Sequence, residues 1–116
     1  MQTSVNIKST ALPAGLPKVG QIANLPMGAI VETPVQVNGA GIHPVHTGAL
    51  PEPIAELLRR ETSVAQLCVD ASVEGSREKA LQCLLLDPVI TDIDTAKKIL
   101  DDYLTSYKEY LPQFWE

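Results

Sequence analysis

The sequence predicts an α+β fold, in which a small antiparallel sheet or hairpin over about residues 3–50 is followed by about four helices over residues 51–112. Two changes near Leu50 indicate this division. Most of the prolines and six of the seven glycines precede it, among short apolar runs rich in β-branched residues. After it, apolar residues recur every three or four positions, as on one face of a helix. With 116 residues, the chain is expected to form a single domain, residues 1–116, around one core.

Alternating β-branched residues predict the strands of the first half. Ile30 to Val37 is the clearest candidate, although Pro34 removes a ladder donor and favours an edge strand or a bulge. Asn38-Gly39 predicts a turn into a second strand over Ile42–Thr47, which makes a hairpin. The preceding stretch is expected to hold a short strand, Thr3–Ile7, and an extended loop, Ala11–Gly20.

Proline, serine and a helical apolar stripe predict the first two helices. Pro51-Glu52-Pro53 suits the start of a helix whose apolar residues precede the charged run Arg59-Arg60-Glu61. Ser63 can cap a second helix, in which Val64 begins a stripe at the spacing i, i+3, i+4, i+7. Gly75 is expected to end it.

Two further helices follow by the same reasoning. Ser76 can cap a third helix, which Asp87-Pro88 stops. Asp94 can cap a fourth, which Pro112 closes.

Two helical segments are apolar over more than a narrow stripe, Val64–Ala71 and Ala80–Leu86. A helix that is apolar over much of its circumference is normally buried on several sides. These segments therefore predict contact with more protein than this chain supplies, either another part of an enzyme or a second copy in a homodimer.

Composition excludes several classes of partner. The formal net charge is −5, from nine Lys and Arg against fourteen Asp and Glu, so the basic surplus that nucleic-acid binding requires is missing. No run of about 18 apolar residues is present to span a membrane, and Met1–Lys8 lacks the features of a signal peptide. We expect a cytoplasmic protein. Cys68 and Cys83 lack the dense spacing of a disulfide scaffold and are expected to be two buried thiols.

Two histidines are the weak candidates for a metal site. His43 and His46 lie three residues apart in Gly41-Ile-His-Pro-Val-His46, and they could bind zinc only with one or two further ligands. Cys68 and Cys83 do not have the spacing of a Cys-x-x-Cys pair. The alternative that we favour is a structural one, in which His43 hydrogen-bonds the loop stiffened by Pro44 and His46 is a partly exposed strand residue.

The acidic residues of the last third could suggest the acid and base of a glycosidase. Each has a structural explanation from its position: a helix cap for Asp94, the turn before it for Asp92, and a solvated helix face for Asp101-Asp102. No catalytic and no cofactor-binding residue is assigned, because the chain contains no G-x-S-x-G, P-loop or G-x-G-x-x-G motif.

A series of short motifs nevertheless carries a family resemblance over roughly Val5 to Tyr110. In chain order they are Gln21-Ile-Ala-Asn-Leu-Pro26, Ala29-Ile-Val-Glu-Thr-Pro34, Gly41-Ile-His-Pro44, Gly48-Ala-Leu-Pro51 and Leu84-Leu-Leu-Asp-Pro88. This series resembles the carboxy-terminal segment of the family 4 glycoside hydrolases, of the α-galactosidase, α-glucosidase and α-galacturonidase type. Glu-Thr-Pro and Gly48-Ala-Leu-Pro51 are similar to the branch that acts on α-galactosides and uronides.

The resemblance implies a fold similar to the C-terminal domain of the lactate-dehydrogenase-like glycosidases. It also implies a mechanism other than the two-carboxylate scheme: NAD transiently oxidises the sugar at C3, a divalent manganese ion held by a Cys and a His polarises the substrate, and a base removes the C2 proton. The Gly-rich nucleotide loop is missing here, and Cys68 does not match the context of the metal-binding cysteine. We therefore expect NAD and Mn2+ in the complete family enzyme and neither cofactor in this chain alone.

Three interpretations follow. The chain is the carboxy-terminal piece of a family 4 glycosidase whose amino-terminal NAD-binding domain is absent, inactive alone, with the missing portion or itself as partner. Alternatively it is a free-standing oligomerisation or interaction module, or a small metal-binding protein that uses His43 and His46. An upstream reading frame for a Rossmann domain would favour the first, a stable homodimer the second, and stoichiometric zinc the third.

Overall fold

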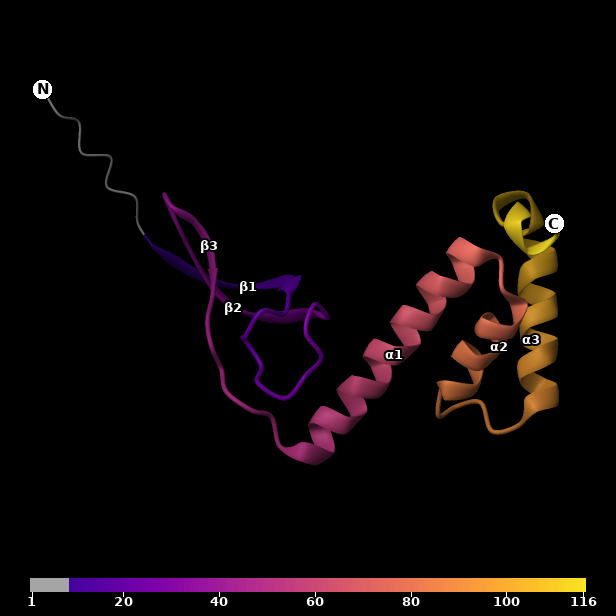
Figure 1. Cartoon of the computed structure of the whole chain (residues 1–116), viewed down its shortest axis with the longest axis horizontal. Helices are drawn as coiled ribbons and strands as arrows, with labels where there is room; N and C mark the ends of the chain where they lie inside the picture. Colours follow the sequence, from indigo (N-terminus) through magenta and orange to yellow (C-terminus); the bar gives the residue numbers. More distant parts are fainter. Residues whose placement is uncertain (1–8) are drawn as a thin grey trace, which may run out of the picture. The chain divides into compact units, whose positions relative to one another are not determined.

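The computed structural model describes residues 9–116, which form two compact units, one up to Leu58 and one from Arg59 onward (Figure 1). The first contains a three-stranded antiparallel sheet and the second is helical. The predicted α+β class is confirmed, with three α-helices within residues 9–116 instead of about four. The strand expected over Thr3–Ile7 lies outside the described residues.

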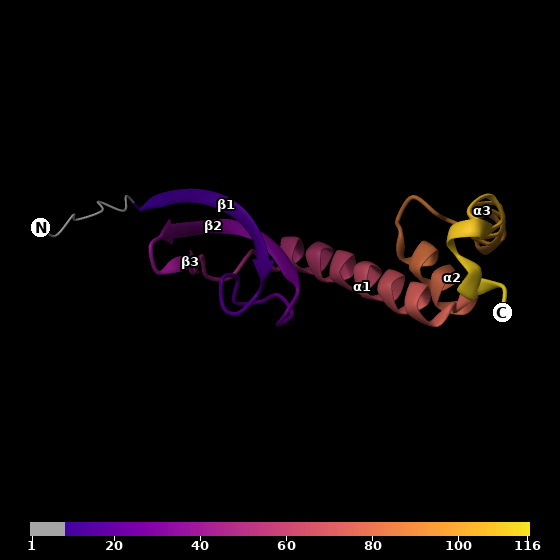
Figure 2. The same ribbon diagram turned by 90° about the horizontal axis from the view of Figure 1, so that it is seen from above.

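The sheet has the order β1-β2-β3 (Figure 2). Its strands are β1 (Thr10–Pro17), β2 (Ile30–Asn38) and β3 (Gly41–Pro44). The predicted hairpin is confirmed, since Asn38 pairs with Gly41 across a turn in which the Asn38 side chain accepts a hydrogen bond from the Ala40 amide at 2.8 Å. β3 is shorter than predicted and ends before Val45.

Two predictions about the prolines were wrong. Ala11–Gly20 is mostly strand instead of loop, and β2, which contains Pro34, is the central strand instead of an edge. Pro13 lies directly opposite Pro34 in the register, and an antiparallel ladder alternates bonded with non-bonded pairs. A non-bonded pair needs no amide hydrogen from either proline. Backbone direction alternates along a strand, so the backbone nitrogen of Pro17, four residues after Pro13, also points away from β2. It lies at the free edge of the sheet, where proline is tolerated.

Alternate residues of β2 form the core of the first unit. Val31, Thr33 and Val35 are buried while the residues between them are exposed, as expected for a sheet with one covered face. The covering residues come from the loop after β1 and from the start of the first helix: Ile22, Leu25, Leu50 and Ala55.

The first helix, α1, is continuous over Glu52–Glu74, so the prediction of two separate helices was wrong. Ser63 does not cap a helix; its hydroxyl donates to the Arg59 carbonyl at 3.1 Å. A serine inside a helix can satisfy its hydroxyl by donating to the carbonyl four residues earlier. No proline or glycine lies between Arg59 and Gly75 to interrupt the helix.

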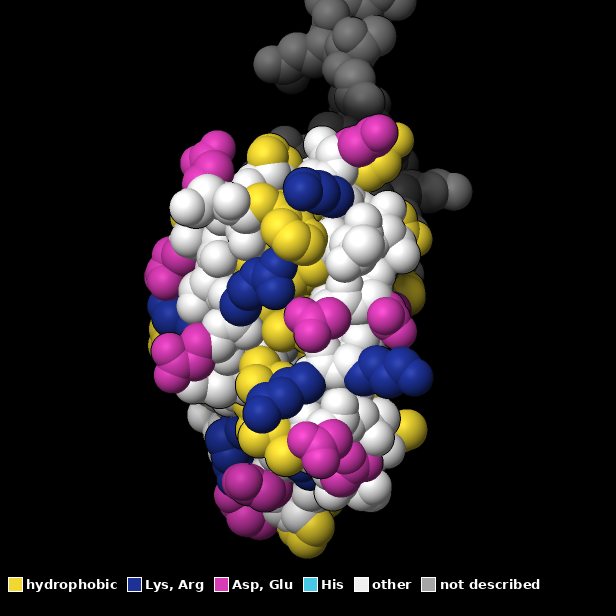
Figure 3. All heavy atoms as spheres, turned by 90° about the vertical axis from the view of Figure 1, so that its right-hand side faces the viewer, with side chains coloured by type: hydrophobic (Ala, Val, Ile, Leu, Met, Phe, Trp, Pro, Cys, Tyr) yellow, Lys and Arg dark blue, Asp and Glu magenta, His cyan; other side chains and the backbone are white. Residues whose placement is uncertain are grey.

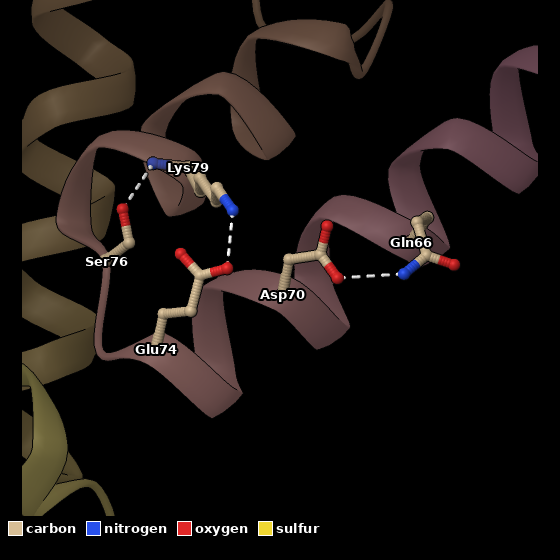
Figure 4. Close-up of polar contacts among 5 residues, drawn as sticks. All are labelled: Gln66, Asp70, Glu74, Ser76 and Lys79. Atoms are coloured by element: carbon tan, nitrogen blue, oxygen red, sulfur yellow. Dashed lines mark hydrogen bonds and ion pairs between the residues drawn. The ribbon is translucent and has the colours of Figure 1, made fainter.

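The helical unit continues with α2 (Arg77–Leu86), α3 (Ile93–Ser106) and two short 3₁₀ turns, η1 (Lys108–Tyr110) and η2 (Pro112–Phe114). Ser76 caps α2 as predicted, accepting a hydrogen bond from the Lys79 amide at 3.2 Å, and Lys79 also pairs with Glu74 at 2.6 Å (Figure 4). Asp87 ends α2 as predicted. Pro112 does not close α3, which ends at Ser106; it begins η2 instead, because proline suits the first position of a helical turn.

The carboxy-terminal tail folds back onto the helices. Phe114 is buried in a core with Ala71, Leu100 and Leu104, and the Trp115 ring lies 4.5 Å from the cationic groups of both Arg77 and Lys108. The Gln113 side chain donates to the Ser72 carbonyl of α1 at 2.8 Å. None of the helices within residues 9–116 is long and apolar enough to cross a membrane.

Gly75 is the position where this folding-back is tightest. Its φ is +67°, and a Cβ atom there would lie 1.9 Å from the Gln113 carbonyl oxygen. Gly75→Ala is therefore expected to lower the free energy of unfolding by about 2–3 kcal/mol, through left-handed strain and displacement of the tail. Urea unfolding followed by helical circular dichroism measures this.

Gly75→Asn serves as the matched variant, because asparagine tolerates positive φ but carries the same Cβ atom. It should be destabilised nearly as much as the alanine variant. Recovery of wild-type stability by asparagine would show that backbone strain, and not the contact with Gln113, decides this position.

Candidate functional site

The motif segments around residues 21–26 and 48–51 lie side by side in the first unit. Ile22 forms an isolated parallel bridge with Gly48. The Thr47 amide donates to the Gln21 carbonyl at 2.8 Å, and the Ala23 amide donates to the Gly48 carbonyl at 2.9 Å. The backbone of the loop after β1 thus finds its hydrogen-bond partners in the segment that leads into α1.

Asn24 continues this pairing with its side chain. Its Nδ2 donates to the Leu50 carbonyl at 2.9 Å, and its Oδ1 accepts from the Leu50 amide at 2.9 Å. The same Nδ2 also lies 3.2 Å from a carboxylate oxygen of Glu52, in the first turn of α1. A primary amide offers a donor and an acceptor side by side. The Asn24 side chain therefore bonds the Leu50 backbone as a neighbouring strand would, and it fixes where α1 begins.

Gln21 organises the other end of the loop from a buried position, with 2% of its surface exposed. Its side-chain oxygen accepts from the amides of Val19 and Gly20 at 2.6 and 3.1 Å, and its Nε2 donates to the Pro17 carbonyl at 3.1 Å. These bonds satisfy a polar side chain that would otherwise be costly to bury. The role of Asn24 leaves no local signal in the sequence, because its partner lies 26 residues away; the bonds of Gln21 are local, but no predicted cap or turn includes them.

The side chains of the two histidines hydrogen-bond different neighbours. His43 lies on β3 with Nε2 3.2 Å from the Asn38 side-chain oxygen, so it bonds the hairpin turn. His46 lies beyond β3, and its Nδ1 bonds the Gly20 carbonyl. Within residues 9–116, no three His, Cys, Asp or Glu side chains come together as a metal site would require.

The acidic residues of the last third also serve separate local contacts. Asp92, not Asp94, is the N-cap of α3, which corrects the prediction: it accepts from the Thr95 amide at 2.8 Å and from the Thr95 hydroxyl at 2.6 Å. The two bonds from Thr95 lower the pKa of the Asp92 carboxyl. Asp101 pairs with Arg77 at 3.3 Å on the surface.

An apolar cavity of about 270 Å³ lies in the helical unit. Side chains of α1, α2, α3 and the tail line it, among them Ala71, Leu84, Leu100 and Phe114. Cys68 and Cys83 line the same cavity. Cys68 is exposed and Cys83 is half-buried, so the prediction of two buried thiols was wrong. Figure 3 views the molecule from the α3 side, where hydrophobic side chains lie exposed among charged ones.

Comparison with known proteins finds a family match over most of the chain. Residues 1–90 match the family 4 glycosyl hydrolase C-terminal domain. The phospho-alpha-glucosidase PagL of Clostridium acetobutylicum is 35% identical over 91 residues, which are 78% of this chain and 20% of that protein. An alpha-galacturonidase of Thermoanaerobacterium saccharolyticum is 31% identical over 97 residues, 83% of this chain and 21% of that protein.

Solved structures agree with the match. A 6-phospho-alpha-glucosidase from gut microorganisms, in complex with NAD and glucose-6-phosphate, superposes with a TM-score of 0.83 at 33% identity, covering 91% of this chain and 24% of that one. A second, in complex with NAD and Mn2+, gives 0.79 at 31% identity, covering 85% and 23%. The chain spans about a fifth to a quarter of the length of the relatives it matches.

Asn24 provides a test of the pairing between the motif segments. Asn24→Asp keeps an acceptor for the Leu50 amide but turns a carboxylate oxygen toward the Leu50 carbonyl and the Glu52 carboxylate. We expect a loss of about 1–3 kcal/mol in unfolding free energy and faster hydrogen exchange at the Leu50 amide. Asn38→Asp is the matched control, because both bonds to Asn38 use only its oxygen; an equal loss there would contradict the assignment.

The Asp92 cap should make the stability of α3 depend on pH. The folded-state pKa of Asp92 is lowered, so its stabilising effect is fully present above the unfolded pKa of about 4. It is lost as the pH falls through the folded pKa. Asp92→Asn keeps the cap without titrating, so wild type should lose stability relative to this variant as the pH falls below about 4. Thermal unfolding at a series of acidic pH values measures this, and an equal fall in midpoint for wild type and Asp92→Asn would contradict the prediction.

Proposed function

The chain belongs to the family 4 glycosyl hydrolases, and from this premise we propose that it acts as the carboxy-terminal part of an NAD-dependent glycosidase that hydrolyses O-glycosyl bonds in carbohydrate metabolism. Family membership rests on the match over residues 1–90. The observation that carries the proposal is the pairing of residues 21–24 with 47–50, because the motifs that resemble the family are the segments that build this junction.

The proposal assigns the chemistry to other parts of the complete enzyme. Solved relatives were obtained in complex with NAD, glucose-6-phosphate and Mn2+, and those proteins are about four times as long as this chain. Two observations support this assignment: His43 and His46 bond separate neighbours, with no three potential metal ligands meeting within residues 9–116, and the sequence contains no G-x-G-x-x-G motif. These 116 residues are therefore proposed to be inactive alone and to bind neither NAD nor Mn2+.

The proposed partner is the remainder of the glycosidase, or a second copy in a homodimer. Apolar side chains on α1 and α3 support this, since Val69, Val73 and Tyr103 are 57%, 79% and 56% exposed. Side chains of this kind normally meet other protein when they lie together. A free-standing oligomerisation module is the second candidate, favoured by the same surface. The two free cysteines support a cytoplasmic location.

Complementation tests the proposal directly. The purified chain is combined with a phospho-alpha-glucosidase PagL from which the matching carboxy-terminal region has been removed. Hydrolysis of a chromogenic 6-phospho-α-glucoside is then followed with NAD and Mn2+ present. We expect product from the combination and none from either part alone. Asn24→Asp should weaken the rescue, whereas Asn38→Asp should leave it unchanged.

Two results would contradict the proposal. Hydrolysis by the chain alone, or an increase in its thermal midpoint with NAD or Mn2+, would mean that it carries a site of its own. A stable homodimer in light scattering that never associates with the truncated relative would favour the oligomerisation module.

A further inference from the structure

Cys68 and Cys83 lie at matching distances from the turn that joins α1 to α2. Cys68 on α1 precedes Gly75 by seven residues, and Cys83 on α2 follows Ser76 by seven. At 1.5 Å per residue each lies about 10 Å from the turn. Two antiparallel helices joined by a short turn bring such positions to the same height.

Local contacts place the Cys83 thiol against the part of α1 that carries Cys68. The Cys83 thiol donates to the Val64 carbonyl at 3.4 Å, and Val64 lies one turn before Cys68 on the same face of α1. Cys68 and Cys83 line the same cavity.

The two cysteines differ in reactivity. Cys68 is exposed, whereas Cys83 is half-buried. Burial raises the pKa of the Cys83 thiol, and the neighbouring Cys68 raises it further. Because the thiolate is the reacting form, the accessible Cys68 is the first to meet an oxidant and Cys83 is placed to react second.

We propose that Cys68 and Cys83 form a reversible thiol–disulfide exchange site for a low-molecular-weight disulfide such as glutathione disulfide. The Cys68 thiolate attacks one sulfur of the disulfide, which forms a mixed disulfide on Cys68 and releases one glutathione thiolate. The Cys83 thiolate then attacks the Cys68 sulfur, which forms the Cys68–Cys83 bond and releases the second glutathione. Two protons leave the protein thiols, the pair loses two electrons, and the glutathione disulfide gains them.

The internal disulfide would join α1 to α2 beside the apolar cavity. It would close a loop of about 15 residues in the unfolded chain, for which the chain-entropy treatment gives a stabilisation equivalent to an increase of about 10 °C in Tm. Reduction by excess glutathione would reverse it. This chemistry is independent of glycoside hydrolysis and would act on the helical unit whatever reaction the complete enzyme performs.

The test incubates the purified 116-residue chain, at low micromolar concentration, with glutathione disulfide and follows intact mass and free thiols. We expect wild type to lose two thiols without gaining a glutathione and to yield one cross-linked peptide pair containing Cys68 and Cys83. Cys83→Ser should stop at a mixed disulfide on Cys68. Cys68→Ser should form a mixed disulfide on Cys83 at least tenfold more slowly.

A matched control moves one thiol along the same helix. The double variant C68S/S72C places a thiol one turn nearer to Gly75, where Ser72 also lines the cavity, and it should form the internal disulfide at least tenfold more slowly than wild type. An unchanged circular dichroism spectrum confirms that each variant folds. Wild type that retains both thiols, forms only cross-links between chains, or reacts no faster than the control would overturn the proposal.

Discussion

The pairing of the loop after β1 with the segment before α1 is the constraint on which the first unit depends. Residues 18–29 make no strand of their own, yet their backbone polar groups must be satisfied. Thr47, Gly48 and Leu50 supply the partners, and the Asn24 side chain adds two bonds where the backbone of the loop turns away. Ile22, Leu25 and Leu50 are thereby held over β2, and the buried Ala55 joins them in the first turns of α1.

The helical unit depends on a second constraint, the turn at Gly75. The left-handed conformation of this glycine ends α1, and the absence of a side chain lets the Gln113 backbone approach. The tail then supplies Phe114 to a core otherwise made of small and aliphatic residues. Phe114 also lines the apolar cavity of this unit, as do Cys68 and Cys83.

Several residues of the family motifs have a structural role in the first unit. Gln21, Asn24 and Leu50 lie within them, and their side chains or backbone hold the first unit together. The residues with reactive side chains behave likewise: His43 and His46 bond the backbone or a turn, and Asp92 caps a helix. These residues hold local structure in a chain that spans about a fifth to a quarter of the length of the relatives it matches.

Local chemistry allowed the sequence alone to determine the α+β class, β2, the hairpin after it, the Ser76 cap and the end of α2 at Asp87. Each depends on residues within a few positions of one another, such as the alternation along β2 or the short reach from Ser76 to the Lys79 amide. Tertiary structure decided the rest. Pro13 could enter a strand because its amide position falls on the free edge of β1, in a non-bonded pair with Pro34, and Asn24 found its partner 26 residues away. Cys68 and Cys83 line one cavity only once α1 and α2 are placed on either side of the turn at Gly75. In each case the deciding contact joins residues far apart in the chain, and no local pattern reports such a contact.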